Sequence, residues 1–141
     1  ADLAPDMVAA TASALAAAGL AERVSCRVAD LDELHGRHAL VACFDVLIHY
    51  PPALFVPMLG QLAALADEQL LFTYAPSTPL LAALHRVGGM FPRSQRRTDI
   101  QMIPDATVQR ALAASGMQIR RSQRVSSGFY HVTLVQAVRS P

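Results

Sequence analysis

Residues 38–52 read HALVACFDVLIHYPP, and the fold predicted for this chain follows from them. Their apolar run leads to Asp45, and after three more apolar residues come His49, Tyr50 and two prolines. A near-continuous apolar run is typical of a central strand in a parallel sheet, where both faces of the strand are covered. We therefore predict a buried strand over residues 38–45 and a turn after it that brings His49 and Tyr50 to the strand's carboxyl end.

Helical and strand-like segments alternate along the rest of the chain. The pattern predicts helices over residues 5–18, 51–66, 78–87 and 105–115, and further strands over residues 24–29, 69–75, 117–125 and 129–138. A Ser-Ser-Gly sequence at 126–128 separates the last two strands and indicates a hairpin. Strands that alternate with helices and end in a hairpin predict an α/β fold, a doubly wound, Rossmann-like sheet with an antiparallel C-terminal hairpin.

The helix predicted over residues 51–66 has an apolar pattern of its own. Four apolar residues recur at helical spacing, which predicts that they form its buried face. They are Leu54, Met58, Leu62 and Leu65. Pro57 lacks a backbone N–H, so we expect the first turns of this helix to be irregular.

Composition narrows the classes of protein to which this chain can belong. With 141 residues, of which 52% are hydrophobic, the chain is long enough for one globular domain with its own core. Its formal net charge of +1 argues against a nucleic-acid partner. All 12 basic residues are arginine, which excludes lysine-based catalysis such as Schiff-base formation. No apolar run approaches the length of a membrane span, and peripheral contact with a membrane stays open.

Cys26 and Cys43 both lie in apolar, strand-like runs. Their spacing fits neither a metal site nor a disulfide framework. We therefore predict two reduced core residues, as is usual in a cytosolic protein.

Ligands of open α/β sheets bind in the crevice outside the carboxyl ends of the strands, and two acidic residues near the N-terminus have such a position. Asp2, followed by Leu3, precedes the first helix and either accepts hydrogen bonds from a ribose diol or serves only the helix start. Asp30, followed by Leu31, ends the strand predicted over residues 24–29. Its carboxylate either accepts from the exocyclic amine of an adenine, with Leu31 under the ring, or makes a local turn.

Further candidates lie at the ends of the next two strands. The carboxylate of Asp45 can leave the apolar layer there, and His49 with Tyr50 follows at the mouth of the crevice. A histidine in this position is either a functional group or a hydrogen-bonded core residue. Tyr74 closes the next strand, and Arg86 lies on the helix after it. Arg86 either grips an acid group of a flat apolar ligand or is solvated on a core helix.

At DVLIHYP, residues 45–51, the sequence resembles the magnesium protoporphyrin IX O-methyltransferases of (bacterio)chlorophyll biosynthesis, which methylate a porphyrin propionate with S-adenosylmethionine. The resemblance covers nearly the whole chain. ADLAPDMV (1–8) is similar to the segment that closes the family's second strand, and VSCRVADLDELHG (24–36) to its third strand and adenine loop. FTYAPSTPLLAALHRVGGMFPR (72–93) and RVSSGFYHVTLVQAVR (124–139) are similar to the family's later blocks.

The resemblance implies a Rossmann-like methyltransferase domain that spans residues 1–141 and binds S-adenosylmethionine as its cofactor. By this resemblance Asp2 would bind the ribose, and Leu3 and Met7 would lie near the adenosine. Asp30 and Leu31 would hold the adenine.

The remaining implied roles concern the reaction. Asp45 would lie near the cofactor's reactive end, whereas His49 and Tyr50 would face the substrate as catalytic residues. Tyr74 and Arg86 are candidate substrate-binding residues because of their place after the next strand, not because of the resemblance. The implied partners are the magnesium porphyrin itself and a magnesium chelatase subunit that hands it over. The implied location is the cytoplasm, with peripheral contact at a photosynthetic membrane left open.

The chain also departs from the family's pattern. Ala4 stands where a serine cap is common, so we expect a weakly capped helix start. The family's sheet has the strand order 3-2-1-4-5-7-6, and its first strands and Gly-rich cofactor loop have no counterpart in these residues. We therefore expect a protein that is longer at its N-terminus, weak cofactor binding by the chain as given, and an exposed hydrophobic edge on the strand over residues 38–45.

Two alternatives remain for the function. One is a methyltransferase of the same fold that acts on another small acid. The other is a porphyrin-binding module without catalytic activity.

Overall fold

In the computed structural model, residues 1–77, 100–128 and 130–140 are described. The chain divides into two units, Ala1–Gly36 and Arg37–Pro141. The helix predicted over residues 78–87 lies outside the described residues. None of the helices within the described ranges is long and apolar enough to cross a membrane.

The first unit is built on α1, Pro5–Ala17, which confirms the helix predicted over residues 5–18. Pro5 fits the first turn because its ring presets the helical φ and its missing N–H has no partner within the helix at this position. Ala4 is the N-cap residue and its side chain makes no capping bond, so the expected weak cap is confirmed. The Oδ1 atom of Asp2 instead accepts a hydrogen bond from the backbone N–H of Ala4 at 2.8 Å.

The strand predicted over residues 24–29 is wrong, because the structure has a single parallel bridge there, between Asp2 and Val28. Two hydrogen bonds flank it: the Asp2 N–H donates to the Arg27 carbonyl at 3.3 Å, and the Ala29 N–H donates to the Asp2 carbonyl at 3.1 Å. A strand needs a partner along its length, and among the described residues only Asp2 pairs with this segment. The bridge still aligns the two segments in parallel.

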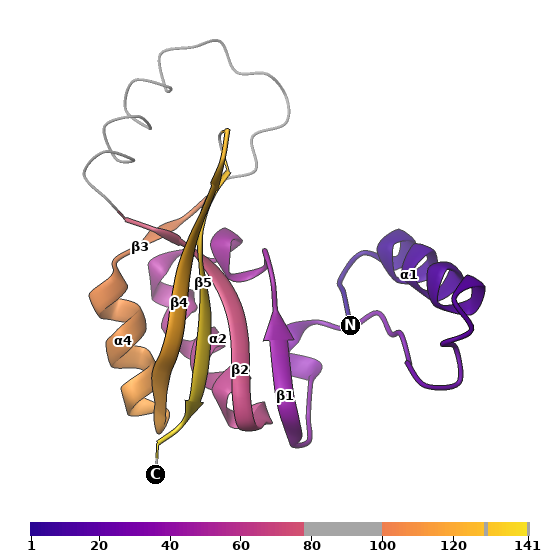
Figure 1. Cartoon of the computed structure of the whole chain (residues 1–141), viewed down its shortest axis with the longest axis horizontal. Coiled ribbons are helices and arrows are strands. Elements are labelled where there is room, and N and C mark those ends of the chain that lie inside the picture. Colours follow the sequence, from indigo (N-terminus) through magenta and orange to yellow (C-terminus); the bar gives the residue numbers. More distant parts are fainter. Residues whose placement is uncertain (78–99, 129, 141) are drawn as a thin grey trace. The chain divides into compact units, whose positions relative to one another are not determined.

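The second unit contains a five-stranded sheet (Figure 1). Its strands are β1 His38–Cys43, β2 Ala66–Pro76, β3 Met102–Ile103, β4 Met117–Ser127 and β5 Tyr130–Arg139. Their order is β1-β2-β5-β4, with β3 paired to β2 off this path. β1 and β2 are parallel, whereas β5 is antiparallel to both β2 and β4. The predicted α/β sheet with a C-terminal antiparallel hairpin is therefore confirmed, and its order agrees with the 4-5-7-6 part of the family's order.

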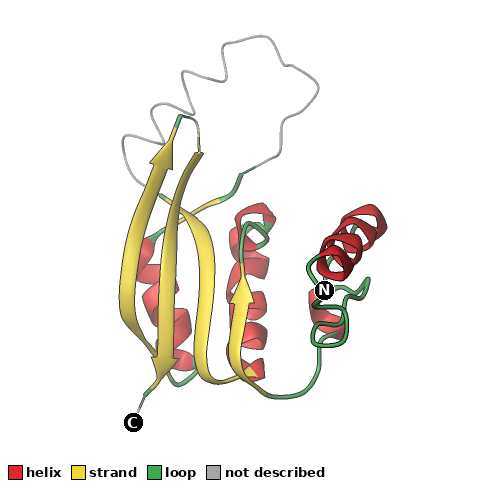
Figure 2. Ribbon diagram, turned by 45° about the vertical axis from the view of Figure 1, so that its right-hand side comes forward, coloured by secondary structure: helices red, strands yellow, loops and turns green. Residues whose placement is uncertain are grey.

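Two helices, α2 Pro52–Leu65 and α4 Asp105–Ala114, cover one face of this sheet (Figure 2). Both were predicted, but the buried face predicted for α2 is partly wrong. Phe55, Leu59 and Leu62 are buried, whereas Leu54 is 48% exposed. The apolar stripe is shifted because Phe55 turns inward and packs edge-on against Tyr74, with ring centroids 6.4 Å apart.

α2 also continues through Pro57, where irregular turns were predicted. Pro57 lacks one backbone N–H and so forgoes one hydrogen bond of the helix. The buried side chains of Phe55 and Leu59 on either side hold the helix against the sheet, because most helical stability in proteins comes from packing.

β1 forms one edge of the sheet as the structure describes it, with β2 as its partner. Cys43 is buried, but Leu40 is 52% exposed, and the strand ends at Cys43 rather than at Asp45. The prediction that this strand is covered on both faces is therefore wrong for the described structure. The exposed hydrophobic edge expected from the family's strand order is confirmed.

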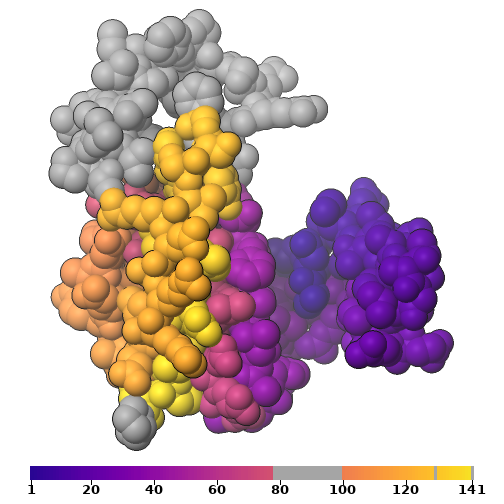
Figure 3. All heavy atoms as spheres, viewed as in Figure 1, coloured from indigo at the N-terminus to yellow at the C-terminus, as the bar shows by residue number. Residues whose placement is uncertain are grey.

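β4 forms the other edge and is exposed along most of its length (Figure 3). It carries Arg120, Arg121 and Arg124, all of them exposed. Arg124 also lies 3.4 Å from the carboxylate of Asp105 on α4. Charged side chains on an edge strand oppose pairing with another chain, so this edge is better protected than β1.

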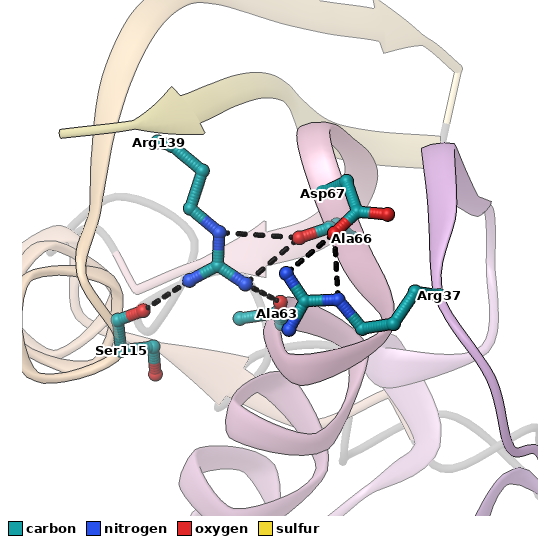
Figure 4. Close-up of polar contacts among 6 residues, drawn as sticks. All are labelled: Arg37, Ala63, Ala66, Asp67, Ser115 and Arg139. Carbon is teal, nitrogen blue, oxygen red and sulfur yellow. Dashed lines mark hydrogen bonds and ion pairs between the residues drawn. The ribbon is translucent and has the colours of Figure 1, made fainter. Parts of the chain in front are cut away.

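Arg139, at the end of β5, joins both helices to the sheet (Figure 4). Its Nη2 donates to the carbonyls of Ala63 at 2.7 Å and Ala66 at 2.8 Å, and its Nη1 donates to the carbonyl of Ser115 at 2.9 Å. The last carbonyl groups of a helix have no partner within the helix. One guanidinium therefore satisfies groups at the carboxyl ends of both α2 and α4, and its charge suits the negative end of each helix dipole.

Replacing Arg139 by methionine should lower the free energy of unfolding by about 2–3 kcal/mol, because three carbonyls lose a charged donor. Urea denaturation followed by circular dichroism measures this loss. Arg37→Met is the matched control, since Arg37 pairs with Asp67 and these side chains are 59% and 44% exposed. That change should cost less than about 1 kcal/mol. Equal losses in the two variants would contradict the bridging role of Arg139.

Candidate functional site

Asp2 and Asp30 belong to the first unit, and the parallel bridge between Asp2 and Val28 brings their segments together. Asp30 caps the short 3-10 helix η1, Leu31–Glu33: its Oδ1 accepts from the Leu31 N–H at 2.6 Å, and its own N–H donates to Glu33 Oε2 at 2.9 Å. The Asp2 carboxylate thus serves the start of α1 and the Asp30 carboxylate makes a local turn, which is one of the two interpretations given for each residue. Their roles in binding ribose and adenine stay predictions.

The apolar residues expected beside the adenosine have different surroundings. Leu3 and Met7 are 59% and 57% exposed, so each offers apolar surface to a ligand. Leu31 is 8% exposed and contributes mainly to the packing of its own unit. Leu3 and Met7 are therefore more accessible than Leu31, and the contacts of all three with an adenosine stay predictions.

Asp45, in the second unit, follows the carboxyl end of β1 and has a left-handed backbone with φ of 57°. Its N–H donates to Thr73 Oγ1 at 2.7 Å, and Thr73 Oγ1 in turn donates to Asp45 Oδ1 at 3.1 Å. The hydroxyl of Tyr130 donates to the same Oδ1 at 2.6 Å. Few residues other than glycine adopt this conformation, but aspartate and asparagine tolerate it, and the three hydrogen bonds hold it in place here.

The next residues form the 3-10 helix η2, Leu47–His49, which places His49. Leu47 and Ile48 are buried, and Ile48 packs in an apolar cluster with Ala75 of β2 and Val132 of β5. The carbonyl of Ile48 also accepts a hydrogen bond from the N–H of Gln101 at 2.8 Å. Two buried residues, Leu47 and Ile48, thus hold the backbone directly before His49.

The His49 residue itself is exposed at the carboxyl end of the strands, and Tyr50 beside it is partly buried. Of the two interpretations offered for this histidine, burial in the core does not agree with the structure. The structure does agree with the prediction that His49 and Tyr50 lie at this edge of the sheet. Their catalytic roles stay predictions.

Tyr130 is a site residue that the sequence analysis did not find. It lies 85 positions from Asp45 in the sequence, and nothing local marks it apart from its place just after the hairpin turn at Gly128. The hydrogen bond to Asp45, together with some burial and the nearby charge, raises the pKa of Tyr130 to about 12. Its hydroxyl therefore remains a donor throughout the neutral range.

Tyr74 lies in the core, where 4% of it is exposed. Its hydroxyl donates to Asp105 Oδ1 at 2.9 Å, and its ring packs on Phe55 and Phe72. Burial, followed by the bond to Asp105, raises the pKa of Tyr74 to about 12. The structure thus gives Tyr74 a packing role, and its predicted contact with the substrate stays a prediction. Arg86 lies outside the described residues.

The two cysteines are unpaired, with Cys43 buried and Cys26 partly buried. Burial raises the pKa of the Cys43 thiol to about 11, which leaves it protonated and unreactive at neutral pH. The prediction of a reduced core residue is confirmed for Cys43.

A family model described as the C-terminus of magnesium-protoporphyrin IX methyltransferase matches residues 43–139 of this chain. The chain belongs to the magnesium protoporphyrin IX methyltransferase family. The match includes Asp45, His49, Tyr50 and Tyr130, whereas Asp2 and Asp30 lie before it.

Curated members of this methyltransferase family match the same chain at the level of sequence. Magnesium-protoporphyrin O-methyltransferase of Synechocystis sp. is 38% identical over 111 residues, which are 79% of this chain and 48% of the relative. The chloroplastic magnesium protoporphyrin IX methyltransferase of Arabidopsis thaliana is 36% identical over 111 residues, 79% of this chain and 36% of the relative. The chain thus spans about half the length, or less, of these curated relatives.

A solved structure of a family member extends the comparison to nearly all of the chain. The crystal structure of the Synechocystis PCC 6803 magnesium protoporphyrin IX methyltransferase with bound S-adenosylhomocysteine superposes with a TM-score of 0.84 at 32% identity. The superposition covers 98% of this chain and 62% of that one. The Rossmann-like methyltransferase fold expected from the sequence is therefore confirmed.

In a pH titration of the folded chain, Tyr130 should ionise near pH 12. Asp45→Asn removes the negative charge while keeping a residue that tolerates positive φ, so the pKa of Tyr130 should fall towards the ordinary value of about 10. Because the folded pKa is raised, the bond's contribution to stability is fully present below about pH 10 and is lost as pH rises through about 12.

NMR of ring-labelled tyrosine resolves the individual phenols for this measurement. Tyr74 is the internal reference, because its partner is Asp105 and the substitution at Asp45 does not touch it. If Tyr130 titrates identically in Asp45→Asn and in the wild type, Asp45 is not its acceptor.

Proposed function

We propose that this protein transfers a methyl group from S-adenosylmethionine to a propionate of magnesium protoporphyrin IX, giving the monomethyl ester, in (bacterio)chlorophyll biosynthesis. Family membership supports the proposal. The observation that carries it is the position of His49, an exposed imidazole at the carboxyl end of parallel strands, on a turn anchored by buried residues. Ligands of open α/β sheets bind at this edge.

The residues of the first unit have the chemistry that the cofactor requires. Asp2 and Asp30 offer carboxylate oxygens to hydroxyl and amine groups, and the bridge at Val28 puts their segments side by side. Leu3 and Met7 add exposed apolar surface for a planar ring. We assign the adenosine end of the cofactor to these residues together with Leu31, and its reactive end to the neighbourhood of Asp45. When bound, S-adenosylmethionine supplies an electrophilic methyl group.

A propionate is already ionised at pH 7, so the reaction needs no strong base. It needs the carboxylate oxygen held in line with the methyl carbon and water kept away, and such alignment contributes up to about 7–11 kcal/mol in favourable cases. His49 orients the propionate by a hydrogen bond and takes up any residual proton. Tyr50 packs on or beside the macrocycle. Tyr74 and Arg86 complete the predicted substrate contacts.

The surroundings of the reaction are also part of this proposal. The magnesium porphyrin is the substrate, and a magnesium chelatase subunit is the partner that would deliver it. We place the reaction in the cytoplasm, at a peripheral contact with the photosynthetic membrane. Co-sedimentation with chelatase subunits or with membrane vesicles tests these two contacts directly.

Calorimetric titration of the product of the complete gene with S-adenosylhomocysteine tests the cofactor assignment. Asp2→Asn should raise the dissociation constant about 10- to 100-fold, since hydrogen bonds to a charged group are lost. Asp32→Asn is the control, because Asp32 is an exposed acid in η1 of the same unit and should bind as the wild type does. Equal affinities for all three proteins would remove Asp2 from the cofactor site.

His49→Ala, in the same complete protein, should lower kcat for porphyrin methylation about 100-fold while the dissociation constant of the cofactor stays unchanged. Ester formation followed by chromatography measures the rate, and His38→Ala, at the opposite end of β1, is the control that should remain active. Wild-type turnover by His49→Ala would exclude His49 from the mechanism.

A further inference from the structure

Tyr130 makes a contact that crosses the sheet. It is the first residue of β5, and β2 lies between β5 and β1 in the sheet. Its hydroxyl nevertheless reaches Asp45 Oδ1, just beyond the end of β1, at 2.6 Å. Thr73 of β2 donates to the same oxygen at 3.1 Å. The carboxylate of Asp45 is therefore held from two strands at once.

The same face of β5 also holds the segment that follows Asp45. Successive strand residues point to opposite faces, so Tyr130 and Val132 share one face of β5. Val132 packs in a buried cluster with Ile48, the residue directly before His49. β5 thus contacts the turn after β1 at two points, once through Tyr130 and Asp45 and once through Val132 and Ile48.

We propose that Tyr130 is a positioning residue for methyl transfer, which acts through Asp45 to fix the turn that presents His49. This inference rests on the proposed function for its catalytic meaning. Asp45 has a left-handed φ of 57°, a conformation that aspartate adopts more readily than most residues, and hydrogen bonds with Thr73 and Tyr130 hold it here. Loss of the Tyr130 hydroxyl leaves Thr73 as the remaining described hydroxyl donor to that carboxylate, and the turn can then relax.

The exposure of Tyr130 allows its role in positioning Asp45 to be distinguished from a role in packing the core. Tyr130 is 36% exposed, so its ring contributes little to the core, and a phenylalanine keeps that ring. The hydroxyl is what the substitution removes. A tyrosine hydroxyl with an ordinary pKa near 10 is protonated in the neutral range, and the raised pKa of Tyr130 widens that margin, so the donor is present at neutral pH.

The first test is a double-mutant cycle in the product of the complete gene. Tyr130→Phe should lower kcat/KM for porphyrin methylation about 10-fold in the wild-type background. In the His49→Ala background it should change kcat/KM less than about 2-fold, because the group that it positions is already gone. Ser126→Ala is the matched control: it removes a 2.6 Å contact to His131 on the same hairpin, and it should retain full activity in both backgrounds.

The second test does not depend on activity. The imidazole C–H resonances of His49, assigned by their absence in His49→Ala, should shift or broaden in Tyr130→Phe and stay in place in Ser126→Ala. A wild-type His49 spectrum in Tyr130→Phe, or losses that multiply independently in the cycle, would overturn the inference. If the wild-type protein fails to methylate the porphyrin but the His49 resonances still respond, the proposed function fails and the structural coupling stands.

Discussion

The guanidinium of Arg139 is the contact on which the arrangement of the second unit depends. β5 carries it to the point where α2 and α4 both end, and its donors reach carbonyls of Ala63, Ala66 and Ser115. Without this donor, carbonyl groups at both helix ends would lose a charged partner. The same strand then reaches, at its opposite end, the turn that carries His49. β5 therefore connects the carboxyl ends of α2 and α4 with the edge of the sheet that carries His49.

The candidate site is held by polar and apolar contacts that have different tasks. Ile48 and Val132 pack together behind the turn and exclude water there. This packing determines how deeply the turn is buried. The hydroxyls of Thr73 and Tyr130 act on the carboxylate of Asp45, which sets the direction of the backbone before η2. Methyl transfer to an ionised acid depends on alignment more than on proton transfer, so a rigid support for His49 is what the proposed chemistry requires.

Periodic patterns made much of the fold predictable. The helices α1, α2 and α4, the hairpin and the type of sheet follow from apolar spacing and turn residues. The errors concern partners that the pattern does not contain. Residues 24–29 have strand-like alternation but pair only at Val28, and α2 buries Phe55 rather than Leu54 because an aromatic partner stands on β2.

The same limit applies to the site. Asp45, His49 and Tyr50 were predicted from local sequence, because the end of a strand is marked by the change from apolar to polar residues. Tyr130 was not, since its relation to Asp45 arises only when β5 inserts beside β2. Asp30 was assigned two interpretations, and its capping of η1 is the local one.

The insertion of β5 between β2 and β4 has a consequence for the order in which the protein folds. β5 follows the other described strands in the sequence, yet it occupies an interior place in the sheet. During synthesis from the N-terminus this sheet cannot be completed until β5 has left the ribosome, and the contact between Asp45 and Tyr130, 85 positions apart, closes a long loop. The geometry around His49 would accordingly mature late, after the helices have formed.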